Sequence, residues 1–201
     1  FVFYRPDRLD DGLARITVMD TGQGLSVWVQ TRDRNLLFDT GTAQAAQTGI
    51  VPSLNAMGVR RLDTLILSHH DSDHDGGLDA VSDIEIGETL AGQPEFYPNA
   101  KFCAEAQWQW DGVDFEILRS SENSGSEDND RSCVLRVVSD GQALLVTGDL
   151  SVKGEAELVE RYGGSLYSQV LILGHHGSNT ASSGGFLNTV APKYAVASSG
   201  Y

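Results

Sequence analysis

The chain opens with alternating apolar and polar residues, the pattern of half-buried β-strands. Residues 15–20 (RITVMD) and 25–30 (LSVWVQ) follow this pattern, and the turn TGQG between them predicts a hairpin. The run NLLFD at residues 35–39 predicts a third strand. The same alternation around Asp-Gly dipeptides, which favour tight β-turns, predicts two further hairpins over residues 108–118 and 133–146.

Segments with helical spacing and short apolar runs fill the rest of the chain. We expect short helices over residues 50–57, 78–84, 153–162 and 183–190, and buried strands over residues 62–67, 84–90, 170–173 and 194–198. Residues 119–131 (RSSENSGSEDNDR) contain no apolar anchor and predict a mobile loop. This order predicts an α/β (α+β) fold in which helices flank two mixed β-sheets and polar loops lie at strand ends.

All five histidines of the chain fall in two loops, and each loop directly follows an apolar run. The first loop is LSHHDSDHDGG at residues 67–77, and the second is LGHHGS at residues 173–178. A single histidine in such a place is usually a surface or capping residue. Two glycine-rich loops that hold every histidine favour a metal site instead, because glycine lets the backbone approach a ligand closely.

Spacing within the first loop indicates which side chains can converge. His69, Asp71 and Asp73 stand at alternate positions and can point the same way, and His74 adjoins them. One ion could be held by His69 and Asp71, and a second by Asp73 and His74. His70 should point away from His69, and we interpret it as a surface residue.

Two other strand ends can complete this metal site. Asp149, in VTGD, follows an apolar run, and its carboxylate could bridge two ions. One histidine of HHGS should close the site from another strand, and we expect His175 to be that ligand. Because successive strand-end residues point oppositely, we do not expect both His175 and His176 to be ligands.

These motifs resemble the metallo-β-lactamase superfamily. HxDxDHxGG at residues 69–77, preceded by DTGQG and LFDTG and followed by TGD and HHGS, stands in the superfamily's order over about residues 16–199. Within the superfamily, the chain is most similar to the C-terminal domain of ComEC-type membrane proteins of competence DNA uptake. The resemblance implies an αββα sandwich with a dinuclear site at one edge, metal-activated water as nucleophile, and a phosphodiester substrate.

The chain departs from the superfamily pattern in two places. Asp71 stands where the superfamily usually has a histidine, a substitution that the ComEC-type branch shares. A further histidine expected upstream of the bridging aspartate is absent, and Asn129, Asp130 or Ser132 could supply an oxygen instead. An oxygen-rich site favours Mn²⁺ over Zn²⁺, so we expect one or two divalent metal ions, Mn²⁺ or Zn²⁺.

Other residues are expected to support the reaction. Ser178, with the backbone N–H groups beside it, could hold a phosphate, and Gln23 in the GQG turn could reach the rim of the site. A plain turn role is the alternative for both. Asp39 should orient a metal ligand or brace the loop rather than bind metal. Asp73 and His176 are the residues expected to carry the catalysis, and the resemblance implies that His176 would donate a proton to the leaving oxygen or bind a phosphate oxygen.

The charge of the chain bears on its substrate. A formal net charge of −14, from 14 basic and 28 acidic residues, argues against the basic patches of non-specific nucleic-acid binders. The resemblance nevertheless implies a nuclease acting on the DNA strand that is not imported, with single-stranded DNA as substrate. The alternatives are a phosphodiesterase for a small or lipid-linked substrate, such as a phosphorylcholine ester, and a degenerate module that only docks on partners.

Location follows from the same resemblance. No apolar run approaches the ~20 residues that span a bilayer, and residues 1–15 lack the apolar core of a signal peptide. We expect residues 1–201 to be one domain excised from a larger protein, with the rest of the membrane channel in the same polypeptide. The domain would then lie at the periplasmic face of the inner membrane. Cys103 and Cys133 favour buried thiols, with a disulfide as the alternative in an oxidising compartment.

Overall fold

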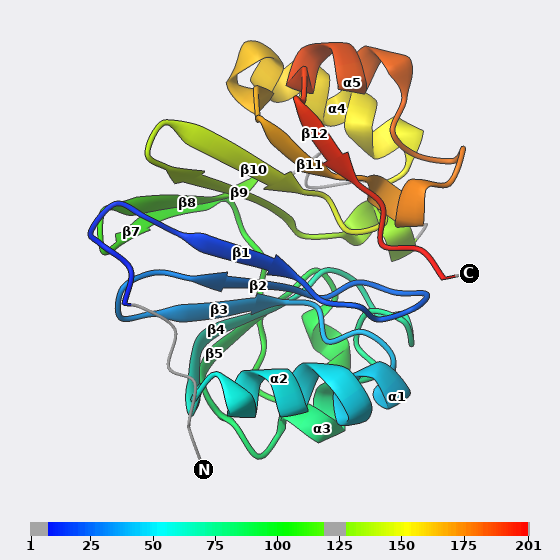
Figure 1. Ribbon diagram of the computed structural model, residues 1–201. Coiled ribbons are helices and arrows are strands. Elements are labelled where there is room, and N and C mark those ends of the chain that lie inside the picture. Colours follow the sequence, from blue (N-terminus) through cyan, green and yellow to red (C-terminus); the bar gives the residue numbers. More distant parts are fainter. Residues whose placement is uncertain (1–7, 119–127, 201) are drawn as a thin grey trace.

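The computed structural model describes residues 8–118 and 128–200, which form two sheets packed face to face with helices on both outer sides (Figure 1). The strand order of the first sheet is β1 (Arg15–Val18), β2 (Val27–Gln30), β3 (Asn35–Phe38), β4 (Arg61–Leu67), β5 (Glu85–Ala91) and β6 (Lys101–Phe102). The strand order of the second sheet is β12 (Tyr194–Val196), β11 (Val170–Ile172), β10 (Gln142–Val146), β9 (Val134–Ser139), β8 (Val113–Leu118) and β7 (Ala106–Trp110). Strands β1 to β3 and β7 to β10 pair antiparallel, whereas β3 to β6 and β10 to β12 pair parallel. Both sheets are therefore mixed, which confirms the predicted fold class.

Helices cover the outer face of each sheet. The first sheet is covered by α1 (Ala43–Ala45), a π-turn (Ala46–Ile50), α2 (Val51–Ala56) and α3 (Leu78–Val81), and the second by α4 (Val152–Tyr162) and α5 (Gly184–Val190). Short 3₁₀ segments are η2 (Pro94–Phe96), η3 (Asp128–Arg131), η4 (Gly163–Leu166) and η5 (Gly174–Gly177). None of the helices in the described parts of the chain combines the length and apolar character needed to cross a bilayer.

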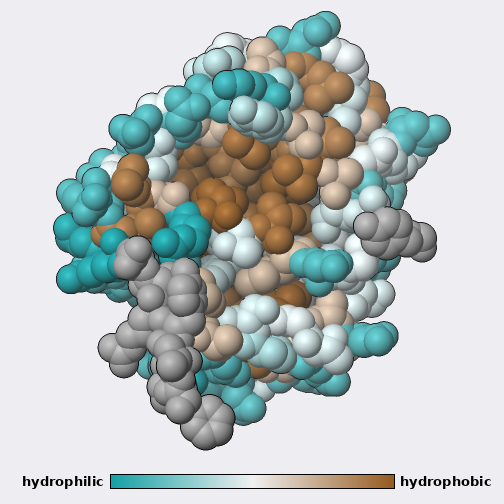
Figure 2. All heavy atoms as spheres, viewed as in Figure 1, coloured by the Kyte–Doolittle hydropathy of each residue, from teal (hydrophilic) through white to brown (hydrophobic). Residues whose placement is uncertain are grey.

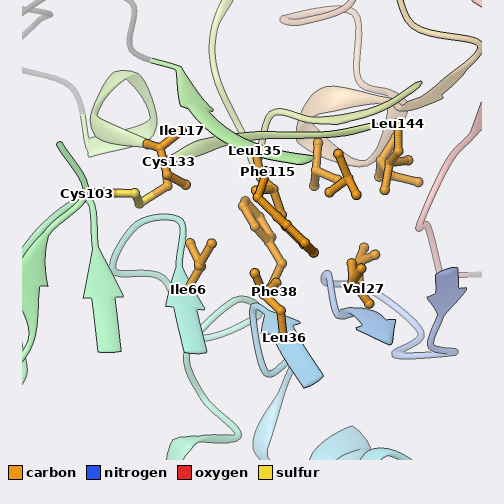
Figure 3. Packing of buried hydrophobic residues seen from close by; sticks show 14 of the residues in the cluster. Val27, Leu36, Phe38, Ile66, Cys103, Phe115, Ile117, Cys133, Leu135 and Leu144 are labelled. Atoms are coloured by element: carbon orange, nitrogen blue, oxygen red, sulfur yellow. A yellow bond between two sulfur atoms is a disulfide. The ribbon is translucent and has the colours of Figure 1, made fainter. Parts of the chain in front are cut away.

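Strand alternation distributes the apolar side chains between the layers. Val27 and Val29 of β2 point into the core between the sheets, whereas Trp28 packs under the helices of the first sheet. Figure 3 shows this core, in which Phe115 from the second sheet lies opposite Phe38 from the first. Both phenylalanines are almost completely buried. The period-two pattern of the sequence thus specifies which face of each strand meets the other sheet.

The helical region after β3 is longer than the sequence predicts. It begins at Thr42, whose hydroxyl accepts a hydrogen bond from the Ala45 N–H at 3.1 Å, and it continues to Ala56. Gly49 and Pro52 obscured the helical pattern in the sequence, because both residue types disfavour a helix interior. Side chains at every fourth position nevertheless pack on the first sheet, namely Ala46, Ile50 and Leu54.

Two other predicted segments differ from the structure. The helix expected over residues 78–84 ends at Val81, and the two-residue strand β6 is too short to leave a pattern in the sequence. Of the loop expected over residues 119–131, residues 119–127 lie outside the described part of the chain. The remainder is the ordered turn η3, in which buried Asp130 accepts a hydrogen bond from the Ser151 N–H, so the prediction of a mobile loop is wrong there.

Cys103 and Cys133 form a disulfide, so the interpretation as buried thiols is wrong. The bond joins the residue after β6 to the residue before β9, and thereby ties the two sheets together (Figure 3). Cys133 also donates its N–H to the carbonyl oxygen of Ser68 at 3.0 Å. The disulfide is therefore linked to the first histidine loop.

An apolar hollow opens between β1 and the second sheet (Figure 2). Its volume is about 310 Å³, and Leu13, Ile16, Leu144 and Val170 are among the residues that line it. No histidine is among the lining residues. The hollow is therefore separate from the histidine loops.

Candidate metal centre

Strand ends from both sheets meet at one edge of the sandwich. Asp39 follows β3 and the loop of residues 68–77 follows β4, both in the first sheet. Asp149 follows β10, and η5 with its two histidines follows β11, both in the second sheet. Ligand sites of open α/β sheets form at the carboxyl ends of strands, and this edge collects the polar side chains in that way.

His74 lies at the centre of these side chains and is fully buried. Its Nε2 atom is 3.2 Å from Asp149 Oδ1 and 3.3 Å from His176 Nε2. His176 Nε2 is in turn 3.1 Å from Asp73 Oδ2 and 3.4 Å from Asp149 Oδ2. Two groups have ligand atoms within 4.8 Å of one another, and both contain His74: His69, His74 and Asp149, and Asp73, His74 and His176.

Asp39 fixes the first histidine loop, residues 67–77, through hydrogen bonds. This residue has a left-handed backbone conformation (φ 58°), and its buried carboxylate accepts hydrogen bonds from the N–H and the hydroxyl of Ser68 at 2.6 and 2.7 Å. The same carboxylate is 2.8 Å from His74 Nδ1. Since Nδ1 is engaged, Nε2 is the nitrogen that His74 presents to the other side chains.

The TGQG turn is docked on the same loop. The Leu25 N–H donates to the carbonyl oxygen of Asp73 at 3.1 Å. Gly24 has φ 125°, and a Cβ atom there would lie 2.3 Å from that oxygen. Only glycine allows this approach of two backbones, so the turn fixes the backbone of Asp73.

His69 supplies a test of whether these residues fit a cation. Its Nδ1 atom is 3.0 Å from the Ser68 hydroxyl, but its Nε2 atom is buried and has no hydrogen-bond partner. A buried polar atom without a partner costs roughly 1–3 kcal/mol. A cation bound between His69, His74 and Asp149 would remove this cost, and nitrogen and carboxylate donors suit a divalent transition metal.

The pKa values of the site reflect opposing effects of burial and charge. Burial lowers the pKa of His69, and the neighbouring His74 acts in the same direction. Burial also acts to lower the pKa of His74 and His176, but hydrogen bonds to carboxylates, above all to Asp149, outweigh it and raise these values to about 10 and about 9. The carboxylates therefore favour the protonated form of both imidazoles. A divalent cation would have to displace these protons, because imidazole binds metal in its neutral form.

The pKa values of the carboxylates of Asp73 and Asp149 are lowered rather than raised. The hydrogen bond from His176 lowers the pKa of Asp73. Burial acts to raise the pKa of Asp149, but hydrogen bonds from His176 and His74 outweigh it and lower that pKa. Both acids are therefore ionised at neutral pH, the form in which a carboxylate binds a metal.

The structure turns His176, rather than His175, toward the carboxylates. His175 Nε2 is 3.8 Å from Asp149 Oδ2, and its Nδ1 lies 2.7 Å from the Thr180 hydroxyl. His176 is instead mostly buried, and its Nδ1 donates to the carbonyl oxygen of Ser198 at 2.9 Å. Both histidines have positive φ, 47° and 57°, so their side chains do not alternate as they would at the end of a strand.

The two groups of metal-binding side chains do not include Asp71. They also do not include Asn129 or Ser132, which were expected to supply an oxygen ligand. Asp71 is exposed, and its Oδ1 accepts the Ser72 N–H at 2.7 Å. Ser132 is nearer, because its hydroxyl is 3.5 Å from His69 Nδ1 and accepts the Asp149 N–H at 3.3 Å. Asn129 contributes its carbonyl oxygen to the turn that places Ser132.

Ser178 and Gln23 make the contacts of turn residues. The Ser178 hydroxyl accepts the Thr180 N–H at 3.3 Å, and Gln23 Oε1 accepts the Gly200 N–H at 3.3 Å. Sequence reasoning missed Ser68, whose hydroxyl contacts Asp39, His69 and His74. Its only signal was its place between a buried strand and the first histidine.

The chain belongs to the metallo-β-lactamase superfamily, whose family model matches residues 19–201. The fold agrees with this assignment. A subclass B3 metallo-β-lactamase with an active-site glutamic acid superposes with a TM-score of 0.64 at 14% identity, covering 94% of this chain and 88% of the other. A metallo-β-lactamase variant from Cronobacter sakazakii gives a TM-score of 0.62 at 16% identity, covering 88% and 89%.

The chain is also similar in sequence to parts of longer bacterial proteins. The chain is 69% identical to competence protein ComA of Neisseria gonorrhoeae over all of its 201 residues, which are 29% of that relative. It is 35% identical to recombination protein 2 of Haemophilus influenzae, over 92% of this chain and 24% of the relative. ComE operon protein 3 of Bacillus subtilis is 26% identical over 92% of this chain and 28% of the relative. The chain thus spans less than a third of the length of these relatives.

Replacing Asp39 by asparagine is expected to weaken metal binding about 10- to 100-fold, the usual effect of losing a partner that orients a ligand. Asparagine keeps the size of the buried side chain but removes the charge that orients His74. Competition with a chromophoric chelator for Zn²⁺ and Mn²⁺ measures the affinity. Asp83→Asn, at an exposed position, is the matched control, and equal affinities in the two variants would contradict the orienting role of Asp39.

Proposed function

We propose that the chain is a metal-dependent phosphodiesterase domain that cleaves single-stranded DNA within a DNA-uptake protein. The observation that carries this proposal is the convergence of His69, Asp73, His74, Asp149 and His176 from both sheets, with His69 Nε2 buried and unpaired. The domain would degrade the strand that is not transported, at the periplasmic face of the inner membrane, as part of a larger membrane protein. The names of the competence relatives support the biological setting.

The two groups share His74, so they describe one cation site that includes His74 and a neighbouring site without it. Asp73, His74 and His176 offer two nitrogens and one oxygen, a donor set that suits Zn²⁺ as well as Mn²⁺. His74 can give its Nε2 to one ion only, because Asp39 engages Nδ1. A second ion would rely on His69, with Asp149 shared between the two and Asp71 or Ser132 nearby.

The chain's own side chains prepare the reaction around that site. A bound divalent cation supplies Lewis acidity toward a phosphoryl oxygen and makes hydroxide available near neutral pH. Asp39 and Ser68 orient the imidazoles of His74 and His69. His175 lies at the more exposed side of Asp149, where its imidazole can donate a proton to a leaving oxygen. This role exchanges the functions expected of the two neighbouring histidines.

Cleavage assays test the proposed function. The purified chain is loaded with Mn²⁺ or Zn²⁺ and incubated with labelled single-stranded DNA, with bis-p-nitrophenyl phosphate and with a choline phosphodiester. We expect cleavage of DNA that EDTA abolishes and added metal restores. Faster turnover of the choline ester than of DNA would favour the small-substrate alternative, which the charge of −14 supports. Metal binding without hydrolysis of any substrate would favour the docking module.

A matched pair of histidine variants tests the assignment of the ligand. His176→Asn should lose tightly bound metal, since His176 Nε2 lies within 3.4 Å of two carboxylates. His175→Asn should retain the metal and lose turnover, because this side chain lies at the edge of the cluster. Metal content after dialysis, measured by mass spectrometry, separates the two effects. Loss of metal in His175→Asn alone would reverse the assignment.

A further inference from the structure

An exposed pair of stacked rings lies beside the candidate metal centre. The rings of His70 and Phe96 have their centroids 4.1 Å apart and are inclined by 20°. Phe96 remains 51% exposed, and the side chain of His70 is 47% exposed. The sequence predicts no role for His70 beyond that of a surface residue. The pair therefore offers a planar aromatic surface to solvent.

The His70 ring is held rigidly in this position. Its Nδ1 hydrogen-bonds to the carboxylate of Asp75, which also accepts the Tyr97 hydroxyl at 2.7 Å. The backbone N–H of His70 donates to Gln93 Oε1 at 2.7 Å. Asp75 and Tyr97 are themselves largely shielded from solvent. The stack is therefore preorganised, so a ligand that lies on it need not pay to order the side chains.

The stack is built on the loop that carries candidate ligands. His70 directly follows His69, and Asp75, which holds the His70 ring, directly follows His74. Phe96 follows Glu95, whose carboxylate pairs with the guanidinium of Arg131 at 2.6 Å. Arg131 is partly exposed and retains N–H donors that a phosphate oxygen can accept. A strand bound along this loop would thus meet an aromatic face and a cation.

We propose that His70 and Phe96 form a stacking subsite for a nucleobase of single-stranded DNA, an inference that rests on the proposed function. Bases stack on aromatic side chains whatever their identity, so such a subsite binds strands without reading their sequence. A stacking subsite also suits DNA binding by an acidic chain. A net charge of −14 argues against a basic track as the main source of affinity, and stacking supplies affinity that does not depend on positive charge.

Steady-state kinetics on two strands test this subsite. The substrates are an oligothymidylate and a strand of the same length made of abasic deoxyribose phosphates. Phe96→Ala should raise KM for the oligothymidylate about 10-fold and leave KM for the abasic strand unchanged, whereas Phe96→Trp should restore the wild-type value. Tyr167→Ala is the matched control and should change neither KM value. Tyr167 is an exposed aromatic residue that precedes β11, whereas the histidines of η5 follow this β-strand.

A second readout does not require cleavage. Ultraviolet irradiation of the chain with oligonucleotides that carry 5-iodouracil should crosslink a base to Phe96 or His70, as identified by mass spectrometry of the peptides. If the wild type cleaves DNA but Phe96→Ala has an unchanged KM, or if crosslinks form elsewhere only, the subsite is refuted and the proposed function stands. If the wild type cleaves no strand yet crosslinks at Phe96, the subsite stands and the catalytic proposal fails.

Discussion

Asp149→Asn should leave the chain folded but without tightly bound metal, and should reduce phosphodiester hydrolysis by more than about 100-fold. Asparagine has nearly the same shape as aspartate, but it removes the negative charge that lies between His74 and His176. Loss of a residue that merely orients a ligand already weakens metal sites 10- to 100-fold, and the loss of a carboxylate that contacts both His74 and His176 should exceed that. Metal content after dialysis and the rate of bis-p-nitrophenyl phosphate hydrolysis measure the effect.

The control for this variant is Asp79→Asn, which makes the same chemical change at an exposed position in the first turn of α3. It should keep the metal and the activity of the wild type. A Mn²⁺ or Zn²⁺ content of Asp149→Asn equal to that of the control would show that the convergence of strand ends does not create a metal site.

Removing the disulfide should lower the free energy of unfolding by about 3–4 kcal/mol, the entropy expected for closing a loop of this size. The two cysteines are 30 residues apart in sequence. The variant carries Cys103→Ala and Cys133→Ala, and urea unfolding of the oxidised wild type provides the reference. Metal affinity should fall as well, because Cys133 follows Ser132, whose hydroxyl accepts the Asp149 N–H.

Reduction of the wild type provides the control for this second prediction. Dithiothreitol should bring the unfolding midpoint of the wild type close to that of the double variant and should leave the variant itself unchanged. A wild-type midpoint that does not respond to reduction would show that the disulfide does not contribute to stability.

Local pattern predicted most of the fold, because each strand alternates its side chains between two apolar layers. The hairpins around Asp111-Gly112 and Asp140-Gly141 were predictable for a further reason. All four residues have positive φ, between 48° and 77°, which aspartate and glycine tolerate in tight β-turns. Sequence alone therefore identified both the strands and the turns that join them.

The features that sequence could not predict depend on backbone conformation or on distances between remote segments. The left-handed conformations of His175 and His176 decide which imidazole faces the carboxylates, and neither residue type requires such a conformation. The pairing of Cys103 with Cys133 depends on how β6 lies against β9. The exposed stack of His70 on Phe96 brings together two segments that are distant in sequence, and no sequence motif links them.

The division of the cluster between two sheets has a consequence for biosynthesis. His69, Asp73 and His74 belong to the first half of the chain, whereas Asp149 and His176 belong to the second. A ribosome that has completed only the first sheet has therefore produced a nascent chain with three of the five donors. The full donor set exists only after β11 and η5 have been translated, so a product truncated before η5 would lack His176.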